Sequence, residues 1–101
     1  METHLLKLIT IIAEDVLENE ICENLSRLGA QGYTITKAHG KGSHRIRSSE
    51  WEGENVRIES ITSSEVALQI LQYLSETYFK QFGVIAYLSD VEVMREKKYI
   101  K

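Results

Sequence analysis

The sequence predicts a small α+β domain in which two β-α-β units are joined by a long loop. Four apolar segments have the length of strands, two segments repeat apolar residues at helical spacing, and residues 39–55 show no apolar period. The chain has 101 residues, 43% of them apolar, and contains no proline. This composition is typical of one folded domain and argues against disorder.

The first half is predicted to hold a strand, a helix and a second strand. Residues 5–13 are mostly apolar on both alternating sides, which is typical of a strand buried on two faces. Glu14 and Asp15 then favour the positive end of a helix. Gly29 is expected to end this helix, and residues 33–38 to form the second strand. The apolar stripe of the helix consists of Leu17, Ile21, Leu25 and Leu28.

The second half repeats this order. Residues 56–61 alternate as a strand with one exposed face does, and Thr62 and Glu65 have the spacing of a capping box in which the Thr62 hydroxyl caps the next helix. That helix is expected to run to about Phe79. Residues 84–88 form a final strand with a short extension at 91–94, and residues 95–101 a charged tail that frays. The stripe expected to be buried is Ala67, Ile70, Leu71, Leu74 and Tyr78.

This order of elements is that of a ferredoxin-like βαββαβ fold. Right-handed crossovers place both helices on one face of an antiparallel sheet. We expect the first and last strands at the centre of the sheet, where their apolar outer sides would lie in water. We therefore predict that the chain forms an oligomer through the face without helices.

Charge and composition exclude several classes of protein. The net charge is −3, yet residues 37–47 carry +4 and no acid, which leaves −7 for the rest of the chain. Such a local basic segment indicates an anion site rather than a nucleic-acid surface. No apolar run has the length of a membrane span, and the start of the chain lacks the features of a secretory signal. The single cysteine, Cys22, excludes an internal disulfide, so we expect a cytoplasmic protein.

The basic segment has the composition of a phosphate-binding loop. Gly40 and Gly42 allow backbone N–H groups to approach an anion, and the arginines can bind phosphate oxygens in a bidentate manner. The spacing is not that of a Walker A motif. On composition alone, a solvated basic loop without a ligand remains the alternative. The segment reads Gly40, Lys41, Gly42, Ser43, His44, Arg45, Ile46 and Arg47.

Two further features of the loop bear on metals and partners. The histidines and carboxylates of residues 39–52 lack the spacing of a zinc site, so no metal is expected. Trp51 is a candidate for contact with a partner, because tryptophan is enriched at binding hot spots. The alternative is that Trp51 folds back on its own oligomer.

Several motifs resemble those of PII-like signalling proteins, most closely the SbtB group and the carboxysome-associated PII-like proteins. The resemblance runs from the first strand to about Val93. It rests on the segments GAQGYTI at residues 29–35, GKGS at 40–43, RSS at 47–49 and EWEGENVRIE at 50–59. It implies one PII-like domain over residues 1–101, with a T-loop at 39–55 and a tail at 95–101, and it implies a homotrimer.

The same resemblance implies a ligand and a partner. Adenine nucleotides (AMP, ADP, ATP or cyclic AMP) would bind as effectors in clefts between subunits, with bicarbonate as a second ligand. The T-loop would signal to a bicarbonate transporter in the membrane or to a carboxysome-related partner, without direct insertion of this chain into the membrane. The phosphates would contact Gly40, Lys41, Gly42, Ser43, His44, Arg45 and Arg47, and the adenine would lie against the backbone of Phe82, Gly83 and Val84.

The chain departs from the SbtB pattern at two points. His44 stands where SbtB proteins have an arginine, which shifts one phosphate contact to Arg45 or makes it pH-dependent. The C-terminal cysteine pair of many SbtB proteins is missing, and with it the associated redox switch and nucleotide hydrolysis. The resemblance therefore implies a regulator and not an enzyme.

Two other functions compete with this interpretation. A small ferredoxin-like enzyme acting on an acyl phosphate or a nucleotide would suit the basic loop, but no nucleophile and base are visible as a pair. An RNA-binding module of this topology stacks bases on aromatic residues of its sheet. The third predicted strand, residues 56–61, contains no aromatic residue.

Overall fold

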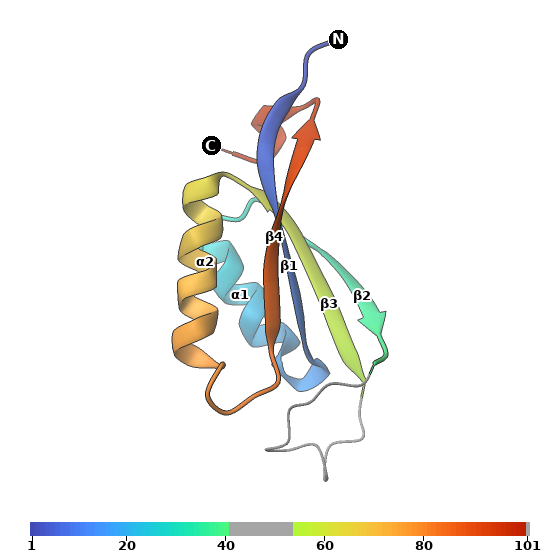
Figure 1. The fold of residues 1–101 in the computed structure, drawn as a ribbon, viewed down its shortest axis with the longest axis vertical. Helices are drawn as coiled ribbons and strands as arrows, with labels where there is room; N and C mark the ends of the chain where they lie inside the picture. Colours follow the sequence, from blue (N-terminus) through green and yellow to red (C-terminus); the bar gives the residue numbers. More distant parts are fainter. Residues whose placement is uncertain (41–53, 101) are drawn as a thin grey trace.

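A computed structural model describes residues 1–40 and 54–100 of the chain (Figure 1). Two short 3-10 helices, Asp15–Leu17 and Glu96–Lys98, follow the first and last strands. The longer elements in the described residues are β1 (His4–Glu14), α1 (Glu18–Leu28), β2 (Thr34–Ala38), β3 (Asn55–Thr62), α2 (Ser64–Thr77) and β4 (Ile85–Val93).

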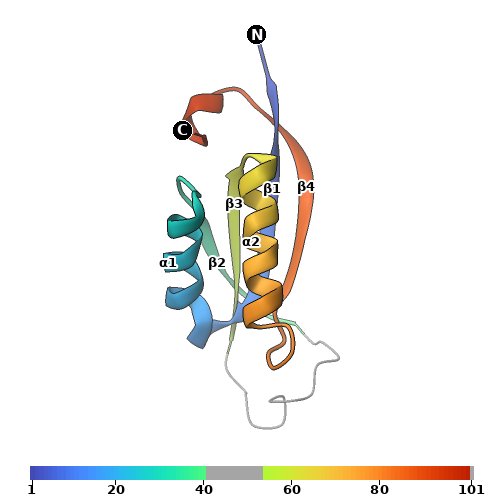
Figure 2. The same cartoon turned by 90° about the vertical axis from the view of Figure 1, so that its left-hand side faces the viewer.

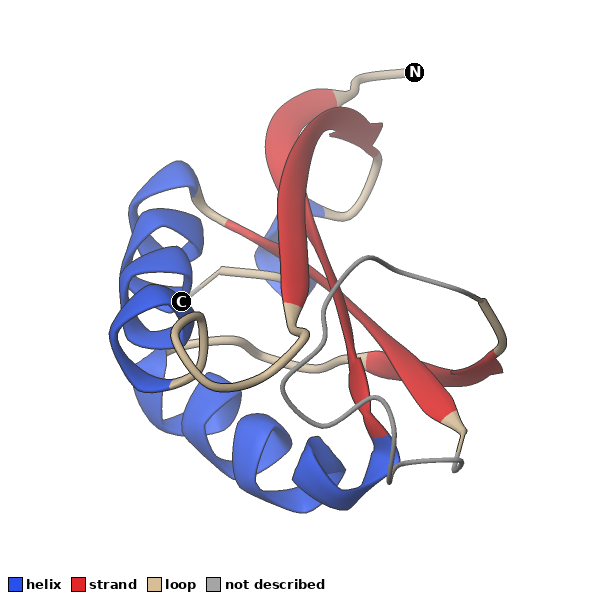
Figure 3. Cartoon of the chain, turned by 60° about the horizontal axis from the view of Figure 1, so that its bottom comes forward, coloured by secondary structure: helices blue, strands red, loops and turns tan. Residues whose placement is uncertain are grey.

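The strands form one antiparallel sheet in the order β2-β3-β1-β4. Both helices lie on the same face of this sheet, so the predicted ferredoxin-like α+β fold is confirmed (Figures 2 and 3). The expectation that the last strand is central is wrong, because β4 is an edge strand and β3 lies beside β1. A crossover helix is about 10 Å wide, roughly two strand spacings, so each crossover leaves room for one strand between the pair it connects.

The core lies between the sheet and the helices. Ile9, Ile11 and Ala13 of β1 point toward the helices and are fully buried. Because side chains alternate along a strand, the other side of β1 faces away from the helices. The fully buried helix residues of this core are Ile21 and Leu25 of α1 and Ile70 and Leu74 of α2.

The sheet face without helices, here called the open face, is apolar along β1 and over much of β4. Leu6 and Thr10 are buried there by their neighbours within the sheet, but Ile85 is 52% exposed and Tyr87 48% exposed. The last strand, β4, is therefore not buried on both faces within one chain. The open face carries Leu6, Leu8, Thr10 and Ile12 of β1, Arg57, Glu59 and Ile61 of β3, and Ile85, Tyr87, Ser89 and Val91 of β4.

The predicted start of the first helix at Glu14 and Asp15 is wrong. Glu14 still pairs with Asn55 in the sheet, the Asp15 N–H donates to the Glu54 carbonyl, and α1 begins only at Glu18, after the 3-10 turn.

The other helix ends follow the sequence with one correction. Gly29 ends α1 with φ of 120°, a conformation that glycine adopts without steric cost. The N-cap of α2 is Ser63, whose Oγ accepts from the Val66 N–H at 3.1 Å, so the predicted Thr62 cap is wrong by one residue. Thr62 is fully buried as the last residue of β3, and its hydroxyl donates to the Ser63 carbonyl.

The C-terminal part of the chain is more ordered than predicted. β4 runs without a break through the predicted gap between residues 88 and 91. Beyond it, the Lys98 N–H donates to the Arg95 carbonyl at 2.9 Å and the Tyr99 N–H to the Glu96 carbonyl at 3.0 Å. The expectation that the tail frays is therefore wrong for residues 96–100, which fold into a 3-10 turn and a short continuation.

Candidate functional site

One end of the sheet carries the base of the long loop. Ala38, the last residue of β2, pairs with Asn55, the first residue of β3, and the Asp15 N–H donates to the Glu54 carbonyl at 3.0 Å. Gly40 lies just beyond β2 and is exposed. We call residues 38–40, 54–55 and 82–84 the loop end. Strand pairing fixes the two stems of the loop, so the chain enters and leaves it from a rigid frame.

Most of the predicted phosphate contacts cannot be placed on this frame. Only Gly40, Phe82, Gly83 and Val84 of the predicted nucleotide site fall within the described residues. The remaining site residues, Lys41, Gly42, Ser43, His44, Arg45, Arg47 and the partner candidate Trp51, lie outside them.

Lys37 is the one cation of the predicted basic segment that the described residues include. Its Nζ lies 3.6 Å from a carboxylate oxygen of Glu54, across the β2–β3 pair. Both side chains are more than half exposed, so this ion pair contributes at most about 1 kcal/mol to stability. Pairing with Glu54 offsets part of the positive charge that the sequence places beside the loop.

The turn before β4 belongs to the same end of the sheet. Ile85 pairs with Ile12 near the end of β1, so residues 82–84 lie beside the point where β1 leaves the sheet (Figure 1). Val84 is buried in the core, and the Phe82 ring packs edge-on against Tyr78 with centroids 5.9 Å apart. The predicted adenine-bordering turn is therefore anchored on one side by the core.

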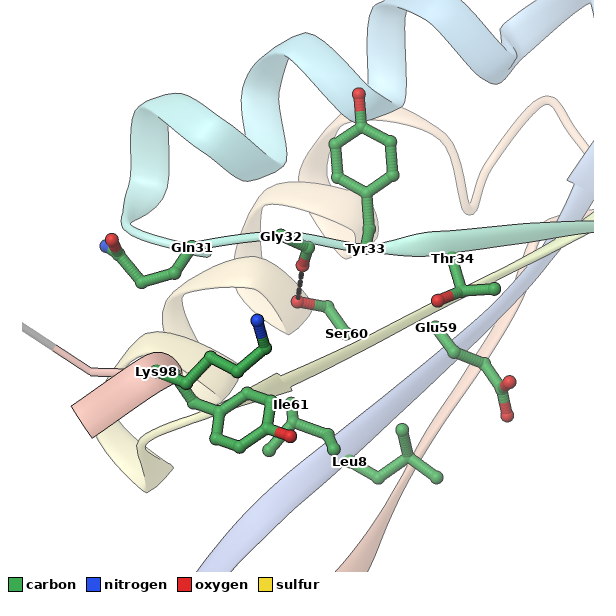
Figure 4. Close-up of a pocket in the computed structure, with 10 residues that line it drawn as sticks. Leu8, Gln31, Gly32, Tyr33, Thr34, Glu59, Ser60, Ile61 and Lys98 are labelled. Atoms are coloured by element: carbon green, nitrogen blue, oxygen red, sulfur yellow. Dashed lines mark hydrogen bonds between the residues drawn. The ribbon is translucent and has the colours of Figure 1, made fainter. Parts of the chain in front are cut away.

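The opposite end of the sheet contains a cavity of about 450 Å³ (Figure 4). Its walls come from the α1–β2 connection, the strands β1 to β3 and the C-terminal turn. We call its lining residues the pocket end. They are Leu8, Gln31, Gly32, Tyr33, Thr34, Glu59, Ser60, Ile61, Lys98 and Tyr99.

The pocket end combines apolar side chains with polar groups, one pair of which is joined by a hydrogen bond. The Ser60 hydroxyl donates to the Gly32 carbonyl at 2.6 Å and fixes the α1–β2 connection on β3. The ammonium group of Lys98 points toward this hydrogen bond (Figure 4). Leu8 and Ile61 supply the apolar surface. The lining includes one carboxylate, Glu59, and one cation, Lys98, so the cavity suits a small ligand with both an apolar part and polar groups.

Tyr33 connects the cavity with the only cysteine. Burial raises the pKa of the Cys22 thiol, which therefore stays protonated and unreactive near neutral pH. The pKa of Tyr33 is raised as well, first by the nearby Cys22 and then by burial, so its hydroxyl stays neutral. Cys22 is 5% exposed and belongs to the core.

The sequence reasoning missed the pocket end. Lys98 falls in the segment predicted to fray, and nothing in the sequence indicates that the chain turns back toward β3 after β4. The sequence does contain Gly32 between Gln31 and Tyr33, and a cation near its C-terminus. Such features are too common to indicate a site. On β1, Leu8 lies at the pocket end and Glu14 at the loop end. Glu14 is the sixth residue after Leu8, which places the two about 20 Å apart.

Two classes of site are absent from the described residues. Residues 1–40 and 54–100 contain no cluster of three histidine, cysteine or acidic side chains that could hold a metal ion. Neither α1 nor α2, the two α-helices of these ranges, has the length and apolar character that crossing a bilayer requires.

The strand order and the two helices on one face define a ferredoxin-like domain, and a cavity lies beside its α1–β2 connection. Residues 6–98 match the family of the nitrogen regulatory protein P-II, and the chain belongs to this family.

Solved structures of PII-like proteins resemble the chain over nearly its whole length. A PII-like signalling protein of Thermus thermophilus is 55% identical over 99% of this chain and 100% of that one, with a TM-score of 0.85. CPII of Thiomonas intermedia K12, bound to ADP, AMP and bicarbonate, is 25% identical over 97% of this chain and 96% of that one, with a TM-score of 0.84. CPII bound to ADP and bicarbonate gives 25% identity over 97% of both chains and the same TM-score, 0.84.

Proposed function

We propose that this protein is a regulatory sensor that binds an adenine nucleotide between its subunits and signals through residues 39–55. One observation carries the proposal: CPII, which shares this fold and 25% of its residues, binds ADP, AMP and bicarbonate. The family to which the chain belongs is one of regulatory proteins. The loop sequence with Lys41, Arg45 and Arg47 supplies the cations that phosphate groups require.

We further propose that the loop end and the pocket end of neighbouring subunits form one site. Within one chain the two ends lie about 20 Å apart along β1, from Leu8 to Glu14, and about 13 Å apart along β2, from Thr34 to Ala38. Each end supplies what the other lacks. The loop that starts at the loop end contains the cations Lys41, Arg45 and Arg47 in its sequence, and the pocket end has a formed cavity and Lys98.

A homotrimer joined through the open face would bring the two ends together. Ile85 and Tyr87 are about half exposed on that face, and water contact with such surface is unfavourable by about 25 cal/mol per Å². Exposed apolar patches of this kind mark interaction sites. The trimer is the assembly that the resemblance to PII-like proteins implies.

Finer assignments extend this proposal. Bicarbonate is the proposed second ligand, since CPII binds it together with ADP. The proposed partner is a bicarbonate transporter or a carboxysome-related protein, reached from the cytoplasm through the loop that contains Trp51. Membership of the SbtB or carboxysome-associated branch is part of the same proposal.

Titration calorimetry of the purified protein tests the nucleotide proposal. AMP, ADP, ATP and cyclic AMP are titrated separately, with and without bicarbonate. We expect saturable binding of at least one nucleotide, and a loss of affinity of about tenfold or more when Lys41 and Arg47 are both replaced by alanine, because two charge-assisted contacts are removed. No heat of binding with any of the four nucleotides, or unchanged affinity in the double variant, would contradict the assignment.

A further inference from the structure

A chain of three polar side chains connects α1 to the end of α2. Tyr78, only 2% exposed, donates its hydroxyl hydrogen to a carboxylate oxygen of Glu20 in α1. The Tyr73 hydroxyl lies 2.8 Å from the Tyr78 hydroxyl, and the two rings meet edge-on with centroids 5.6 Å apart. The Tyr78 ring is thus held by two hydrogen bonds and by packing.

Tyr78 also shapes the turn that follows α2. Its carbonyl oxygen accepts hydrogen bonds from the N–H groups of Gln81 at 3.1 Å and Phe82 at 2.9 Å. Its ring packs edge-on against Phe82 at an interplanar angle of 76°. The backbone and the side chain of one residue therefore both act on the start of the segment 82–84.

We propose that Tyr78, fixed by Glu20 and Tyr73, is the positioning residue for the turn formed by Phe82, Gly83 and Val84. This inference rests on the proposed function, in which this turn lies against the nucleotide base. Tyr78 would not contact the ligand. It would hold the turn in one conformation before the ligand arrives, so that binding requires less ordering of the backbone.

The location of the turn explains why it needs an anchor. It leads into β4, an edge strand with a single neighbour in the described sheet, so pairing restrains it from one side only. Apolar packing of the Tyr78 ring would suffice for stability. Two hydrogen bonds to partners on different elements additionally select one orientation of the ring, as satisfied polar networks do.

Hydrogen exchange tests the positioning itself without a ligand. In Tyr78→Phe the ring remains but both hydroxyl contacts are lost. We expect the amides of Gln81 and Phe82 to exchange about tenfold faster. A tenfold change corresponds to the free energy of about one hydrogen bond. The control is Ser63→Ala, which removes the N-cap at the other end of α2 and destabilises the same helix. Equal changes at these amides in both variants would overturn the proposal.

Base selectivity tests the consequence for binding. Affinities for ATP and GTP are measured for the wild type, Tyr78→Phe, Glu20→Ala and Glu20→Gln. Because a misplaced turn impairs contacts to the base and not to the phosphates, we expect Tyr78→Phe and Glu20→Ala to reduce the preference for ATP about threefold to tenfold. Glu20→Gln keeps an acceptor oxygen and should restore the preference.

The outcomes separate this inference from the proposed function. Equal losses for ATP and GTP, or failure of Glu20→Gln to restore selectivity, would overturn the positioning role. If the wild type binds none of AMP, ADP, ATP and cyclic AMP, the proposed function fails. In that case, the exchange rates of Gln81 and Phe82 still decide whether Tyr78 anchors the turn.

Discussion

The two ends of the sheet differ in how their functional groups are held. At the pocket end, a hydrogen bond from Ser60 to the Gly32 carbonyl and the turn around Lys98 form a cavity within the folded chain. At the loop end, strand pairing and Tyr78 fix the frame, while most of the predicted ligand contacts belong to residues 41–47. One end therefore offers a formed recess, and the other leads into the sequence that we propose binds phosphate.

This difference underlies the proposal that the site is shared between two subunits. In the same molecule, the recess and the stems of the loop lie about 20 Å apart along β1 and about 13 Å apart along β2. A second copy, placed on the open face, can bring a loop end to a pocket end. The predictions below separate the contributions of the open face, the pocket end and the loop end.

The largest effect is expected from Ile85→Asp. This substitution places a carboxylate on the open face, where it would be buried in a trimer without a partner. We expect the trimer to dissociate and nucleotide binding to be lost with it, because each site would need two subunits. Light scattering after size-exclusion chromatography gives the mass, and calorimetry gives the binding.

Leu68→Asp is the matched control for this prediction. Leu68 is 58% exposed, comparable to Ile85 at 52%, but it lies on α2 on the other side of the sheet. We expect this variant to remain a trimer that binds nucleotide. A trimeric Ile85→Asp protein, or equal dissociation of both variants, would count against the open face as the subunit interface.

Gly29→Ala should lower the stability of the folded chain, because Gly29 starts the α1–β2 connection that leads to the pocket end. Gly29 has φ of 120°, and an added Cβ would lie 3.1 Å from a methyl group of Val66. We expect the free energy of unfolding to fall by about 2 kcal/mol in urea denaturation, from backbone strain together with crowding. Gly32→Ala is the control, since a Cβ there meets nothing within 4 Å. Comparable losses in both variants would contradict this explanation.

Lys98→Met should weaken nucleotide binding without changing the fold. Methionine keeps much of the apolar stem of lysine but removes the ammonium group at the cavity, so we expect a loss of affinity of about tenfold, the effect of one charge-assisted contact. Lys97→Met, its neighbour outside the cavity lining, serves as the control. An unchanged calorimetric affinity in Lys98→Met would remove the pocket end from the proposed site.

The smallest effect concerns stability at alkaline pH. The pKa of Tyr78 is raised, first by burial and then by its hydrogen bonds with Glu20 and Tyr73. At a pH at which a tyrosine of the unfolded chain ionises, Tyr78 of the folded chain therefore stays protonated. The unfolded state then binds fewer protons, and stability falls as pH rises above about 10, by up to about 1.4 kcal/mol per pH unit. Urea denaturation between about pH 9 and about 11 should show a shallower decline in Tyr78→Phe. Parallel slopes in the two proteins would contradict this assignment.

The alternation and spacing of apolar residues were enough to predict the fold class and most element boundaries. Ile9, Ile11 and Ala13 fall on one side of a strand, and Gly29 ends α1, because these choices depend on local geometry. The position of β4 at the edge was not predicted, because apolar residues on both sides of a strand do not distinguish a central strand from an edge strand that an oligomer covers.

The two ends of the sheet were not equally accessible to sequence reasoning. The basic loop that starts at the loop end was predicted because its glycines and cations are close together in the sequence. The pocket end was missed because Gly32, Ser60 and Lys98 come from three distant segments, and only the fold brings them together. The cap of α2 was misplaced because Thr62 and Ser63 are chemically equivalent candidates, and the pairing of Thr62 with Lys7 assigns Thr62 to the sheet.

Subunit mixing tests the shared site most directly. Lys41→Ala/Arg47→Ala impairs only the loop end, and Lys98→Met impairs only the pocket end. Each variant alone should bind nucleotide weakly. After refolding as a one-to-one mixture, random assembly pairs an intact loop end with an intact pocket end at about one quarter of the sites, which should regain the affinity of the wild type. A mixture of trimers that binds no better than its two components would contradict a site shared between subunits.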